Sequence, residues 1–112
     1  MSTDKKIKLN KLQAKTLALA QQVVIAQGDV GNNEDGSVTL LRLPQPHGNH
    51  VHVGKFVVSV ADFTGFDNGN VWSALQRKGL VIEMDGGAIA ITQQGLSFET
   101  GLGEKFLQAS DH

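Results

Sequence analysis

The sequence contains no cysteine, which excludes a disulfide framework, thiol catalysis and cysteine-based zinc sites. No apolar run approaches the roughly 18 residues that a membrane-spanning helix needs, so we expect no membrane contact. The polar start over residues 1–5 does not resemble a signal peptide. Together these absences favour a cytoplasmic protein.

Proline is also scarce, with two prolines against thirteen glycines, which indicates tight turns rather than extended linkers. The chain has 112 residues, of which 40% are hydrophobic and 19% are charged. This composition excludes a disordered chain, because there is enough apolar surface to build a core. The length fits one domain over residues 1–112.

Positive charge is concentrated at the amino terminus, although the formal net charge of the whole chain is only −1. Five lysines face one aspartate within residues 1–15, whereas acids outnumber bases by ten to five in the remainder. The lysines are Lys5, Lys6, Lys8, Lys11 and Lys15. They form either a solvated helix face with a frayed terminus or an arm that contacts phosphates.

Apolar residues at three- and four-residue steps predict a first helix over residues 7–27, and Gly28 supplies its left-handed cap. Residues 37–43 and 50–53 have the composition and alternation of strands. The simplest pairing is an antiparallel hairpin over about residues 37–53, inserted after the first helix.

The second half of the chain carries several helix and turn signals. We expect a short helix from about Val60 to Thr64, and then a longer helix that Asp67 or Asn68 caps and that ends at Lys78 before Gly79. The pattern over residues 80–92 predicts strand, tight turn and strand, and Thr92 is placed to cap a last helix to about Glu99.

Residues 59–75 resemble the helix-turn-helix of phage repressors and many bacterial regulators. Three residues carry this resemblance: Ala61 is small where the two helices should cross, Gly65 should take the turn conformation, and Val71 should pack in the angle between the helices. A large side chain at the crossing or a Cβ in the turn would separate the helices.

The resemblance extends to residues 56–98. A hairpin follows the second helix at once, and Ile91-Thr92-Gln93-Gln94-Gly95 is similar to the start of the last helix in regulators of the multiple-antibiotic-resistance type. The resemblance implies an α+β winged helix-turn-helix, with the helix-turn-helix at about 59–78, the wing at about 80–92 and the inserted hairpin between the first and second helices. Residues 29–53 depart from it, because most winged helices connect these elements with less chain.

Such a fold implies a transcriptional regulator that binds double-stranded DNA, and the apolar first helix favours a homodimer. The outward residues of the second helix are the candidates for reading bases: Asn70, Ser73, Gln76 and Arg77. The candidates for phosphate contacts are Lys5, Lys6, Lys8, Lys11, Lys15 and Lys78. We expect Trp72 to lie in the core.

Acidic residues support an alternative function. Asp67 on the second helix, with Glu83 and Asp85 on the wing, carries the wrong sign for phosphate contacts. The alternative is a winged-helix module that contacts another protein and has no nucleic-acid or catalytic role.

The remaining chemical candidates are three histidines, His47, His50 and His52. Three imidazoles can bind zinc, copper, iron or nickel, but the simpler interpretation is a polar hairpin surface, so we expect no specific metal site and no cofactor. No spacing suggests a nucleophile elbow, a catalytic triad or a phosphate-binding loop. We therefore expect no enzyme.

Overall fold

The computed structural model describes residues 7–41, 46–53, 56–100 and 108–109. Helix α1 (Lys11–Gln27) begins at a capping box: the Asn10 side chain accepts the Gln13 N–H at 2.8 Å, and the Gln13 side chain accepts the Asn10 N–H at 3.1 Å. The helix therefore starts four residues later than predicted, and Lys8 precedes it. It ends at Gly28, whose φ of +68° favours glycine as expected.

One antiparallel sheet joins β1 (Val38–Thr39), β6 (Ile89–Ile91) and β5 (Val81–Glu83) in that order. Strands β5 and β6 form the predicted hairpin, closed by the short 3-10 segment η3 (Asp85–Gly87). Strand β1 pairs with the far side of β6, and the Leu40 N–H continues the pairing to the Ile89 carbonyl at 2.8 Å.

The predicted hairpin over residues 37–53 is wrong, because β1 belongs to the first sheet. Strand β3 (His50–Val53) instead lies between β2 (Pro46–His47) and β4 (Phe56–Ser59) in a second sheet, whose outer strand is β7 (Gln108–Ala109). Burial explains why β1 and β3 belong to different sheets. Strand β3 pairs Val51 with Val58, and both are buried, whereas β1 places the buried Val38 opposite the buried Ile91.

Two short helical segments lead to the longest helix of the second half. They are α2 (Val60–Phe63) and the 3-10 helix η2 (Thr64–Asp67), and α3 (Gly69–Arg77) follows. Asn68 caps α3 by accepting the Asn70 N–H at 3.0 Å. At the other end the N–H groups of Gly79 and Leu80 bond back to Gln76 and Leu75, a Schellman motif with Gly79 at φ +80°. Both predicted helix ends are confirmed.

The expected roles of Ala61 and Gly65 are wrong. Ala61 is exposed and lies at no helix crossing. Gly65 is buried inside η2 without a positive φ, and a Cβ built on it would collide with the Thr16 side chain of α1. Glycine is needed there for space rather than for a turn conformation, because η2 approaches α1 at this point.

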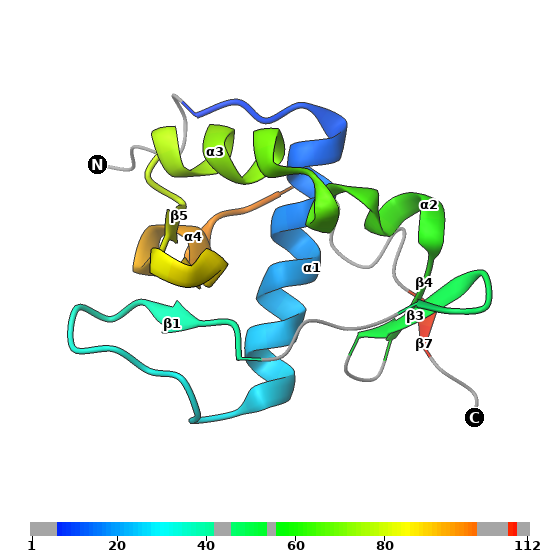
Figure 1. The fold of residues 1–112 in the computed structure, drawn as a ribbon, viewed down its shortest axis with the longest axis horizontal. Coiled ribbons are helices and arrows are strands. Elements are labelled where there is room, and N and C mark those ends of the chain that lie inside the picture. Colours follow the sequence, from blue (N-terminus) through cyan, green and yellow to red (C-terminus); the bar gives the residue numbers. More distant parts are fainter. Residues whose placement is uncertain (1–6, 42–45, 54–55, 101–107, 110–112) are drawn as a thin grey trace.

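Helix α1 runs between the two sheets, with α4 on the side of the first sheet (Figure 1). This position explains why the consecutive residues 16–20 are all buried. The side chains with the least exposure form the core: Leu17, Leu19, Leu75, Leu80, Ile91, Val51, Val53 and Val81. The structure is thus α+β, and none of its described helices is long and apolar enough to cross a membrane.

Two further predictions are confirmed in this core. Trp72 is buried, its ring meets Phe66 edge-on at 5.3 Å, and its indole N–H donates to the Phe66 carbonyl at 3.0 Å. The last helix, α4 (Gln93–Ser97), is capped by the Thr92 hydroxyl, which accepts the Gly95 N–H at 3.0 Å. It stops at Ser97, before Glu99, because Phe98 is extended.

Candidate nucleic-acid interface

Helix α3 has one buried side and one exposed side, as its sequence predicts. The buried residues are Val71, Trp72, Ala74 and Leu75. On the other side lie the four candidates for reading bases: Asn70, Gln76 and Arg77 are exposed, and Ser73 is half-buried. Their spacing of three and four residues places them along one stripe of the helix, which we call the α3 stripe.

Strand β5 bonds to the middle of the α3 stripe. The Ser73 hydroxyl donates to the Glu83 carboxylate at 2.9 Å, and the Gln76 side-chain oxygen accepts the Glu83 backbone N–H. These bonds fix two of the four candidates and bring an acid beside them. The Gln76 amide NH₂ takes no part in this bond.

The candidates for phosphate contacts differ in their exposure to solvent. Lys8 and Lys11 are exposed, and Lys15 is half-buried on α1. Lys5 and Lys6 lie outside the described residues. Exposure leaves the first two ammonium groups open to a polyanion.

Lys78 holds the amino-terminal segment against α3. Its ammonium group donates to the Lys8 carbonyl at 2.6 Å and to the Gln13 side-chain oxygen at 3.2 Å. Residues 7–10 accordingly run beside α3 (Figure 1). No local pattern in the sequence indicates this contact, which brings Lys8, Arg77 and Lys78 together at the carboxyl end of α3.

The histidines lie at the second sheet, away from α3. The rings of His50 and His52 meet edge-on with centroids 5.0 Å apart, as their alternate positions on one strand predict. His47 is opposite His50 in the strand register, and its side chain lies outside the described residues. Within the described part of the chain, no group of three potential ligands is placed to hold a metal ion.

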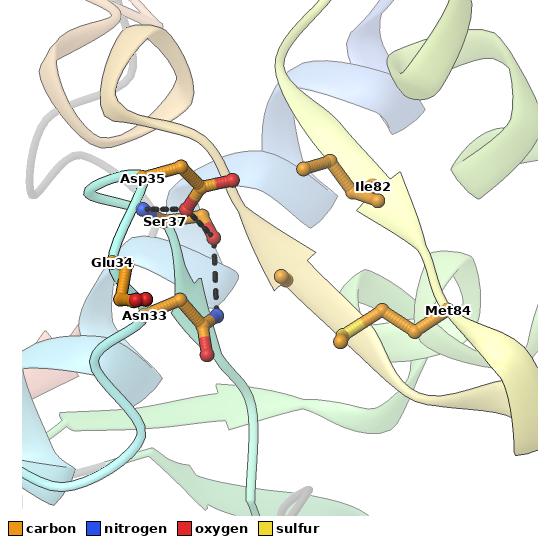
Figure 2. Close-up of a pocket in the computed structure, with 7 residues that line it drawn as sticks. Asn33, Glu34, Asp35, Ser37, Ile82 and Met84 are labelled. Carbon is orange, nitrogen blue, oxygen red and sulfur yellow. Dashed lines mark hydrogen bonds between the residues drawn. The ribbon is translucent and has the colours of Figure 1, made fainter.

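A cavity of about 460 Å³ is a feature that sequence reasoning missed. It lies between the loop at residues 33–37 and the outer face of β5 and β6 (Figure 2). Its lining residues are Asn33, Glu34, Asp35, Ser37, Ile82, Met84 and Ala90. The loop was recognisable from its composition, but nothing in it indicated which face of the sheet it would cover.

We compared the chain with protein-family models, with curated proteins and with solved structures, and no match was found in any of the three.

Proposed function

We propose that this protein is a winged helix-turn-helix that binds double-stranded DNA and regulates transcription, with α3 as the recognition helix. The order α1, β1, α2, α3, β5, β6 supports the fold once the inserted strands β2, β3 and β4 are set aside, and β1 completes a three-stranded sheet beside the hairpin. In a winged helix, the hairpin follows the recognition helix in the same way.

The observation that carries the DNA function is the α3 stripe. It exposes two amides and a guanidinium beside the half-buried Ser73 hydroxyl, and it contains no large apolar side chain. A helix of this kind fits the major groove of B-DNA, where amides and arginine bond to base edges. Arg77, Lys78 and Lys8 supply positive charge at one end, where phosphates would flank the groove.

The bond between Gln76 and Glu83 refines which bases the stripe would read. With its oxygen accepting the Glu83 N–H, Gln76 offers a donor to the groove. It therefore matches the acceptor edges of guanine or thymine better than the bidentate edge of adenine. Asn70 has no such restraint and remains suited to adenine.

Titration of mixed-sequence duplex DNA at two salt concentrations, followed by fluorescence anisotropy, tests the proposal. We expect binding that weakens steeply with salt. Asn70→Ala should lower the affinity for preferred sites by roughly 1–3 kcal/mol, the value of a good base contact. Asn49→Ala is the matched control, because Asn49 is exposed at the turn between β2 and β3.

A second candidate function rests on the acids. Glu83 is bonded to Ser73, and Asp85 is exposed at the hairpin turn, so the wing would repel phosphates. This favours contact with another protein. If the full chain binds neither mixed-sequence nor genomic duplex at low salt, the DNA function is refuted and the protein-contact module replaces it.

A further inference from the structure

The cavity in Figure 2 has an apolar floor on the first sheet. Ile82 on β5 and Met84 directly after it, respectively 36% and 40% exposed, point toward the loop at residues 33–37. Ile82 pairs with Ala90 across the hairpin, so these residues share the outer face of the sheet. The cavity has a volume of about 460 Å³ and is open to solvent, because five of its seven lining residues are exposed: Asn33, Glu34, Asp35, Ile82 and Met84.

The opposite wall is polar, and the side-chain donors of Ser37 and Asn33 are already used. The Ser37 hydroxyl donates to one oxygen of Asp35 at 2.6 Å, and the Ser37 N–H donates to the same oxygen at 2.9 Å. The Asn33 amide nitrogen donates to the Ser37 and Thr39 hydroxyls, each at 3.0 Å. Among the described residues that line this cavity there is no lysine or arginine.

This wall therefore presents hydrogen-bond acceptors to a ligand. The second Asp35 oxygen takes neither of the Ser37 bonds and points across the gap toward Ile82 (Figure 2). Glu34 adds a second carboxylate at the rim. The bonds from Ser37 also hold the pKa of Asp35 below its ordinary value, so this carboxylate is charged at neutral pH.

We propose that the cavity binds a small organic ammonium ion, with its cationic head on Asp35 and its apolar body on Ile82 and Met84. An anionic ligand would meet two carboxylates without a counter-charge. A neutral apolar ligand would displace water from the exposed Asp35 carboxylate without replacing its hydrogen bond. An ammonium ion with a short hydrocarbon chain can donate a hydrogen bond to Asp35 and pack its chain against Ile82 and Met84.

The test follows the methyl resonance of Met84 by NMR during titration with hexylammonium chloride. Met1 is the other methionine of the chain and gives an internal reference. We expect a saturable shift at Met84, and binding weaker by about two- to fivefold for hexanol, which keeps the chain but loses the ion pair with an exposed carboxylate. Hexanoate and ammonium chloride should produce no saturable shift.

Two matched variants separate a site from general attraction. Asp35→Asn keeps an oxygen that accepts both Ser37 bonds, so the loop is retained, and we expect binding of hexylammonium to weaken by about two- to fivefold. Asp85→Asn removes the same charge from the hairpin turn outside the cavity lining and should leave binding unchanged.

Three results would overturn the proposal: no saturable shift at Met84, equal affinities for hexylammonium and hexanol, or equal losses in the two variants. None of these measurements involves DNA, so the ligand site and the proposed function succeed or fail separately.

Discussion

The hydroxyl of Thr16 is fully buried against Gly65. Among the residues that the structure describes, no group forms a hydrogen bond with this hydroxyl. This pair marks the contact between α1 and η2, on which the placement of α3 depends. The contact requires a glycine on one side, while the buried hydroxyl on the other side costs free energy because its hydration is not replaced.

Gly65→Ala should lower the free energy of unfolding by about 1–3 kcal/mol, because the new methyl group would overlap the Thr16 side chain. Chemical denaturation measures this change. Gly69→Ala is the matched control: a Cβ there meets no atom within 4 Å, and its φ is not positive, so stability should stay equal or rise. Equal losses at the two glycines would contradict the close contact.

Ala61→Leu gives a second comparison on the same segment. Its side chain is exposed, so the free energy of unfolding should change by no more than about 0.5 kcal/mol. The helix-crossing role that the motif spacing assigned to Ala61 predicts instead a loss of roughly 1–3 kcal/mol from overpacking. The two interpretations therefore differ in a single denaturation experiment.

Thr16→Val should raise the free energy of unfolding by about 1 kcal/mol, since it replaces a buried hydroxyl without a partner by a methyl group of similar size. Thermal and urea unfolding both report it. Thr92→Val has the opposite expectation, because the Thr92 hydroxyl caps α4 and donates to the Gly79 carbonyl at 2.7 Å. A loss of stability in Thr16→Val would show that its hydroxyl has a partner.

The stability that Asp35 and Ser37 contribute should depend on pH. The side-chain and backbone hydrogen bonds from Ser37 lower the pKa of Asp35 from 3.8, so folding favours the charged carboxylate. This contribution is present above the ordinary value and disappears as the pH falls through the lowered one. The difference in unfolding free energy between wild type and Ser37→Ala should accordingly shrink in acid. An NMR titration in which Asp35 has the same pKa in both proteins would contradict this.

We expect a two-fold homodimer of about 24 kDa, twice the 12.0 kDa of the chain. Three exposed apolar side chains gather at the carboxyl end of α1 and the nearby loops: Ile25, Val30 and Leu41, at 69%, 57% and 54% exposure. Static light scattering at tens of micromolar protein measures the mass, and Ile25→Asp should reduce it to the monomer. A wild-type mass of 12 kDa would contradict the predicted dimer.

Removing residues 1–8 deletes three lysines and should reduce the salt dependence of DNA binding. The slope of log affinity against log salt should flatten by up to about 2.7 if all three contact phosphates. Gln76→Ala should instead weaken preferred sites while leaving the slope nearly unchanged. An unchanged slope after truncation would assign the phosphate contacts to other parts of the chain.

Local signals explain which parts of the fold the sequence predicts correctly. The caps at Asn68, Gly79 and Thr92 act on atoms within a few residues, so α3, the hairpin and α4 were predictable. Asn10 is an equally local cap, but the apolar pattern continues on its amino-terminal side to residue 7. The predicted start of α1 was therefore four residues too early.

The remaining features depend on contacts between distant segments. The motif spacing at Ala61 and Gly65 does not state which residue faces α1, and only the tertiary arrangement decides this. The same holds for the contact of Lys78 with the Lys8 carbonyl and for the bond between Ser73 and Glu83. In the candidate interface, the sequence thus identifies which residues are exposed but not how they are bonded.

The pairing of β1 with β6 also determines the order in which the first sheet can form. The β5–β6 hairpin closes a short loop, an event that takes microseconds, whereas Val38 and its partner Ile91 are 53 positions apart in the sequence. The entropy of closing that loop must be overcome before β1 adds any stabilising contact, and an isolated two-stranded hairpin is only marginally stable. Folding of this sheet should therefore wait for α2 and α3 to bring the hairpin back to α1, and β1 should be the strand whose amides exchange with solvent first when the native protein opens.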